Sequence, residues 1–177
     1  SALSIARFGM RKIKTPDSFR KLVEILNSAA LEIVKKNIAY AFNRIGDKES
    51  LSPYQSELKS LSSNSNPYTR MWSFSALGKL QDTANIEYLI TSLEHEEDWR
   101  VRINLCNALG NILPDLNSPL TDKITESLLR HATEDASTHV SIVALQSLGK
   151  LFKGLDIRNP IARKIQQEIQ FILTPNK

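Results

Sequence analysis

Apolar residues recur at intervals of three and four along most of the chain, the spacing that places them on one face of an α-helix. Four such stretches lie within residues 38–45, 72–77, 105–109 and 140–148. Each is too apolar on one side to be stable alone, so we expect it to pack against neighbouring helices. The sequence lacks the alternating pattern and the hairpin turns typical of strands. The pattern therefore predicts an all-α protein.

One ten-residue pattern occurs three times. The stretches MWSFSALGKL, INLCNALGNI and VALQSLGKLF align on Gly78, Gly110 and Gly149, and Gly9 and Gly46 extend the series at spacings of 37, 32, 32 and 39 residues. Periods of this length are typical of stacked helical hairpins. Since the apolar pattern continues beyond the last three glycines, we expect them inside helices, where glycine costs about 1 kcal/mol relative to alanine. We expect the missing side chain to let adjacent helices approach closely.

A second set of helices is predicted between the glycine-bearing ones. Most of them begin with a capping residue followed by proline, which suits a first helical turn. Each repeat is then a first helix, a short turn and a second helix, and the whole chain (1–177) is predicted to be one right-handed α-solenoid of about five stacked hairpins. Because the chain starts inside a second helix, we expect it to be a piece of a longer repeat protein. The predicted first helices span 15–27, 52–63, 85–94, 118–132 and 159–173.

The second helices also share a motif upstream of the glycine. The stretch DWRVRINLCNALG (98–110) has Asp, two residues, Val-Arg and then Ala-Leu-Gly, and 66–78 keeps the arginine as Arg70, whereas 137–149 has Ser141 there. This motif resembles HEAT repeats of the short, phycobilisome-lyase type. The resemblance covers nearly the whole chain and implies a HEAT/armadillo-like superhelix.

The same resemblance implies roles for individual residues. Asp98, Arg70 and Arg102 are expected to form a polar ladder that links successive repeats. Relatives with enzyme-linked functions leave two alternatives open: a bilin lyase or other chromophore-handling subunit, and a HEAT-like DNA glycosylase. Nothing in the sequence marks a bilin site beyond the shared repeat.

The charge distribution disfavours nucleic acid as a partner. The net charge is +4, but residues 1–50 carry +5, 51–100 carry −3, 101–150 carry −1 and 151–177 carry +3. A phosphate backbone favours a continuous positive track, and the acidic middle interrupts it. No apolar run is long enough to span a membrane, and no secretory leader is visible, so the cytoplasm is the default compartment.

Candidate catalytic and metal-binding residues are sparse. His95, His131 and His139 never occur at the i,i+4 spacing of a helical zinc pair. Cys106 takes an apolar position of its repeat, so we expect a buried thiol rather than a nucleophile. We therefore expect no cofactor and no metal, and no small-molecule ligand is indicated.

The concave surface of the predicted solenoid is the best functional candidate, because second helices line it. An apolar row of Ala39, Met71, Ile103 and Ile142 would run beside a row of amides and a hydroxyl. Such a face either binds a partner or is partly buried as ordinary core, and the sequence leaves both open. We predict a non-enzymatic scaffold that binds a protein or peptide through Tyr68, Met71, Ser75, Arg100, Ile103, Asn107, Ile142 and Gln146.

Overall fold

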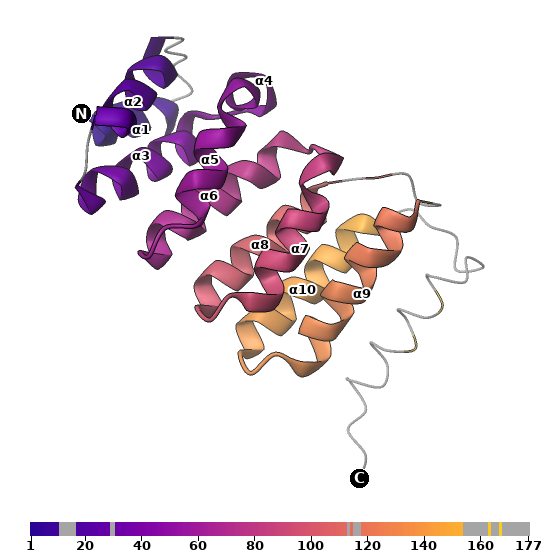
Figure 1. The fold of residues 1–177 in the computed structure, drawn as a ribbon. Helices are drawn as coiled ribbons and strands as arrows, with labels where there is room; N and C mark the ends of the chain where they lie inside the picture. Colours follow the sequence, from indigo (N-terminus) through magenta and orange to yellow (C-terminus); the bar gives the residue numbers. More distant parts are fainter. Residues whose placement is uncertain are drawn as a thin grey trace.

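A computed structural model of the chain describes residues 1–10, 17–28, 31–112, 114, 118–153, 163 and 167, with only the backbone of 8–10. These residues form helices and turns, and none of them lies in a strand, which confirms the all-α prediction (Figure 1). The predicted helix 159–173 lies outside the described residues. The helices are α1 (Ala2–Met10), α2 (Asp17–Ser28), α3 (Glu32–Ile45), α4 (Lys48–Leu51), η1 (Ser52–Tyr54), α5 (Gln55–Ser62), α6 (Pro67–Leu80), η2 (Thr83–Asn85), α7 (Ile86–His95), α8 (Trp99–Asn111), α9 (Pro119–Glu134) and α10 (Thr138–Leu151).

Successive hairpins stack along one axis, from the N-terminal helices to α9 and α10 (Figure 1). The second helices α3, α6, α8 and α10 pack directly against one another in that order. The first helices are farther apart, and grooves of about 390 and 430 Å³ open between α2 and α5 and between α7 and α9. A stack that is tight on one side and open on the other is concave on the tight side. The second helices therefore line the concave face, as predicted.

Two of the repeat glycines allow this tight packing. A Cβ atom on Gly78 would lie 2.6 Å from Cα of Ala108 in the next second helix, and one on Gly110 would lie 2.6 Å from Cβ of Ser147. Both distances are far below van der Waals contact, so only glycine permits the observed separation. Gly46 differs, because α3 ends at Ile45 and the glycine follows as its C-cap. The predicted role of close approach is thus confirmed at two of the repeats.

The first helix of the second hairpin starts earlier than predicted. We expected one helix over 52–63, but α4 begins at Lys48 because Asp47 and Ser50 form a reciprocal capping box. The Asp47 carboxylate accepts from the Ser50 amide at 2.9 Å. Pro53 has no N–H group to donate, and the chain passes through the 3₁₀ turn η1 before α5. A local hydrogen bond upstream of the proline therefore determines the helix start.

A ladder of arginines links successive hairpins, as the resemblance implied. Arg70 donates two hydrogen bonds to Glu96, at 2.7 and 2.8 Å, and Arg102 donates two to Asp135, at 2.8 and 2.9 Å. Both arginines also donate to carbonyl oxygens of the turn before their own helix. The prediction was wrong for Asp98, which pairs with Arg100 of its own helix. The acceptors are instead carboxylates from the following turn.

The ladder carboxylates also cap helices. Glu96 accepts from the amide of Asp98 at 3.0 Å, and Asp135 accepts from the amide of Ser137 at 2.8 Å. Burial raises the pKa of Asp135, but the hydrogen bonds from Arg102 and from the Ser137 amide outweigh burial, so the pKa lies below its ordinary value. Each ladder step thus joins the turn of one hairpin to the second helix of the hairpin before it.

Candidate functional site

The helical period determines which side chains of the second helices face outward. At 100° per residue, the positions ten, six and three before the repeat glycine and one after it share one side of the helix. The glycine itself and the position seven before it point instead toward the next second helix. The outward positions define the concave face, to which α6, α8 and α10 contribute four residues each and α3 contributes three, with Asp47 following the end of α3.

The row ten before the glycine contains a network that joins two repeats. The guanidinium of Arg100 lies 4.9 Å from the centre of the Tyr68 ring and donates to the Tyr68 hydroxyl at 2.9 Å. Arg100 also donates to both oxygens of Asp98, at 3.0 and 2.6 Å. The hydrogen bond from Arg100 lowers the pKa of Asp98 to about 2. Tyr68 stays 44% exposed, so this pair presents an ordered aromatic and cationic surface.

Aromatic contacts continue the network on both sides, and the sequence analysis missed them. Trp99, 43% exposed, packs against His139 of the next second helix with ring centres 5.4 Å apart and ring planes tilted by 36°. Tyr40 meets the ring of Trp72 edge-on at 5.1 Å. Trp72 belongs to the apolar stretch 72–77, but it is only partly buried. Tyr40 and Trp72 both lie six positions before their repeat glycines, and this shared position is the sequence signal for the contact.

The predicted apolar row is only partly a surface. Ala39 is fully buried, Met71 and Ile103 are partly buried against the core, and Ile142 is 49% exposed. The physical reason is their direction, because this row points at the neighbouring second helix rather than away from the stack. Of the two interpretations that the sequence left open, burial as core therefore holds wholly for Ala39 and partly for Met71 and Ile103, and Ile142 is the exposed member of the row.

The row of amides and a hydroxyl consists of the residues three before each repeat glycine, and it is buried at the α3 end and exposed at the α10 end; its members are Asn43, Ser75, Asn107 and Gln146. Asn43 is 6% exposed and accepts a hydrogen bond from the Ser75 hydroxyl at 2.9 Å. Asn107 is partly buried and accepts from Lys150 at 3.4 Å, whereas Gln146 is exposed. Polar groups at the α3 end thus satisfy one another. Those of α8 and α10 keep capacity for a partner.

A model of the HEAT repeats matches residues 19–110, slightly more than half of the chain. The protein belongs to the HEAT repeat family. Comparison with curated proteins gives no match. HEAT repeats are generally protein-interaction scaffolds. The matching model describes HEAT repeats in general, so the phycobilisome-lyase subtype stays a prediction.

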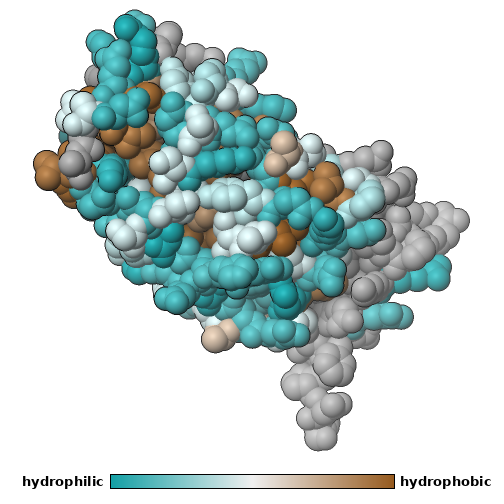
Figure 2. Space-filling view, viewed as in Figure 1, coloured by the Kyte–Doolittle hydropathy of each residue, from teal (hydrophilic) through white to brown (hydrophobic). Residues whose placement is uncertain are grey.

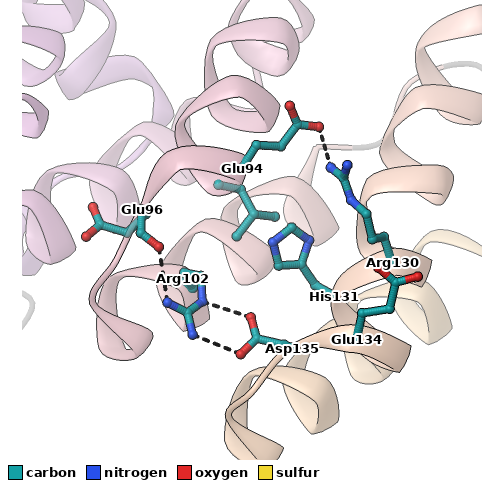
Figure 3. A pocket seen from close by; sticks show the side chains of 8 residues that line it. Glu94, Glu96, Arg102, Arg130, His131, Glu134 and Asp135 are labelled. Atoms are coloured by element: carbon teal, nitrogen blue, oxygen red, sulfur yellow. Dashed lines mark hydrogen bonds and ion pairs between the residues drawn. The ribbon is translucent and has the colours of Figure 1, made fainter.

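The HEAT hairpins also leave a groove of about 350 Å³ on the convex side, between α7 and α9 (Figure 3). Charged side chains that line it form salt bridges with one another, since Arg102 pairs with Asp135 and Arg130 pairs with Glu94. The Nδ1 atom of His131 lies 2.9 Å from the carbonyl oxygen of Ser127. The described residues contain no group of three or more side chains placed to hold a metal ion. We interpret this groove as the gap between splayed first helices.

The remaining chemical candidate of the HEAT repeats is the thiol of Cys106. Cys106 is fully buried in α8, as predicted. Burial raises the pKa of the thiol to about 12. The thiolate fraction near neutral pH is therefore negligible, and the group packs as a small apolar side chain.

The surface of the HEAT stack is mostly hydrophilic, and hydrophobic side chains gather near its N-terminal end (Figure 2). Leu3, Leu31 and Ile33 are exposed there. Among the helices of the described residues, none has the length and apolar character needed to cross a membrane.

Proposed function

We propose that this protein is a non-enzymatic scaffold whose concave face binds an extended segment of a partner protein. One observation carries the proposal: exposed aromatic and cationic side chains are held in place there by contacts between repeats. Tyr68 is positioned by Arg100, and His139, which also occupies an outward position, is contacted by the partly exposed ring of Trp99. Tyrosine, tryptophan and arginine dominate the energetics of protein interfaces. Side chains that are already ordered lose little entropy on binding.

The polar residues next to these rings suit an extended backbone. Asn107 and Gln146 each offer an amide with donor and acceptor atoms, on adjacent second helices α8 and α10. Ile142 lies one helical turn before Gln146 on α10 and exposes about half of its surface. An extended segment could therefore exchange main-chain hydrogen bonds with the amides and bury a side chain against Ile142. The bound segment would follow the axis of the stack.

The test compares two single substitutions of matched chemistry. Ile142→Asp places a charge at the edge of the concave face, one helical turn before Gln146 on α10, and Ile25→Asp places one on α2; Ile25 is 41% exposed and Ile142 is 49% exposed. Both variants should fold, since surface substitutions usually change stability by about 0.5 kcal/mol or less. Ile103 is unsuitable for this test, because it is partly buried and a charge there would destabilise the fold.

Each protein is immobilised and exposed to a lysate of the source organism, and the captured proteins are quantified by mass spectrometry. We expect a partner that the wild type and Ile25→Asp retain and Ile142→Asp loses. If all three proteins capture the same partners in equal amounts, the concave face is not the binding surface.

A further inference from the structure

The first and second helices of the hairpins differ in their balance of charged residues. The second helices α3, α6, α8 and α10 contain eight lysines and arginines and one carboxylate, Glu32. The first helices α2, α5, α7 and α9 contain eight carboxylates and five lysines and arginines. Each block of about fifty consecutive residues contains both first and second helices, so net charges summed over such blocks do not reveal this difference. The acidic residues of the middle of the chain belong to the first helices and the turns.

Half of the cations of the second helices are already paired. Arg70, Arg100, Arg102 and Lys35 each form a salt bridge with a carboxylate. The other four form none with a carboxylate of the described residues. They are Lys36, Arg44, Lys79 and Lys150, and all are partly or fully exposed.

These four cations lie on the concave side. Lys36, Lys79 and Lys150 occupy outward positions of the helical period, and Arg44 donates to the hydroxyl of Tyr40 at 3.2 Å. Lys79 donates to the carbonyl oxygens of Asn43 and Gly46, at the end of α3. Burial, and then the charge of Arg44, lower the pKa of Lys79, with Asp47 opposing them. Two cations therefore lie close to each other on this face, near Asp47, which is the one carboxylate among its outward positions.

We propose that the segment bound on the concave face is acidic, with aspartate or glutamate side chains that pair with these lysines and Arg44. The inference rests on the proposed function and specifies its partner. Complementary charge favours association and disfavours other partners. The first helices, in which carboxylates such as Glu126 and Glu134 outnumber cations, would repel the same segment, so it would be directed to one side of the solenoid.

The experiment selects peptides from a random displayed peptide library on the wild-type protein. Selected peptides are then sorted by whether they bind the Ile142→Asp variant. We expect the peptides that lose binding to be enriched in aspartate and glutamate over the unselected library. If these peptides are neutral or basic, the inference fails and the proposed function stands. If no peptide depends on Ile142, the proposed function fails.

Charge-matched variants then locate the contact by fluorescence anisotropy with the strongest acidic peptide. Lys36→Gln with Lys150→Gln removes two concave charges, and Lys21→Gln with Lys123→Gln removes two from first helices. The concave pair should weaken binding about threefold to tenfold and the control less than about twofold, since each exposed pair contributes modestly. Raising the salt from about 50 to about 500 mM should weaken the wild type. Equal effects of the two double variants would overturn the proposal.

A labelled single-stranded DNA oligonucleotide serves as the competing probe. It should bind far more weakly than the acidic peptide, because the concave cations are interleaved with uncharged residues such as Asn107 and Gln146 rather than forming a continuous track. If the oligonucleotide binds more tightly than the peptide and depends on Lys36 and Lys150, the face is a nucleic-acid surface and the proposal is wrong.

Discussion

Replacing Gly78 by alanine should destabilise the protein, although alanine is the better helix former. A Cβ atom there would lie 2.6 Å from Cα and 2.7 Å from Cβ of Ala108. Carbon atoms normally approach to about 3.5–4.0 Å, so α6 and α8 would have to separate by about 1 Å. Overpacking of this kind costs about 1–3 kcal/mol, whereas helix propensity returns about 1 kcal/mol. Because the clash is with backbone rather than with a flexible side chain, we expect a cost in the upper part of that range and a net loss of about 1–2 kcal/mol.

The same substitution at Gly149 is the matched control. No atom of the described residues lies within 4 Å of a Cβ atom at Gly149. Gly149→Ala should therefore stabilise α10 by up to about 1 kcal/mol. Urea unfolding followed by circular dichroism at the helical band measures both variants. The two midpoints should move in opposite directions, and the reasoning is refuted if Gly78→Ala is as stable as the wild type.

Further substitutions address the buried polar groups and the thiol. Thr69 is fully buried with an unpaired hydroxyl, and Val101 has the same position in the next repeat, so Thr69→Val should stabilise by about 1 kcal/mol in the same urea assay; a destabilised variant would point to a bonded hydroxyl. Arg102→Ala should cost about 2–4 kcal/mol, because it leaves Asp135 partly buried without its partner. Since the folded pKa of Asp135 is lowered, the pair stabilises at neutral pH and this contribution disappears as the pH falls through that pKa, so the stability gap between wild type and Arg102→Ala should narrow in acid; a constant gap would contradict the assignment. Cys106 should react with a thiol reagent at pH 8 only after denaturation, because its pKa is about 12 and it is buried; rapid labelling of the folded protein would show that the site opens.

Local chemistry made much of the fold predictable. The spacing of apolar residues indicated helices, and the recurrence of glycine indicated stacked hairpins, both of which the structure shows. The side chains of Asn66, Asp98 and Ser118 cap the helices that follow them. Caps and helical periods act over a few residues, so a single sequence records them. Where a competing local hydrogen bond arose, as between Asp47 and Ser50, the predicted helix start was wrong.

The candidate site was less predictable, because its residues are defined by their neighbours in space. Whether the row of Met71, Ile103 and Ile142 is surface or core depends on the angle at which the next second helix packs. The partners of Arg70 and Arg102 come from turns 26 and 33 residues later in the chain. The difference in charge between the side formed by the first helices and the side formed by the second helices also exists only once the hairpins are stacked. Sequence alone determined the helices and their repeat, through interactions within a few turns, whereas the directions of side chains on the concave face were decided by packing between helices far apart in the chain.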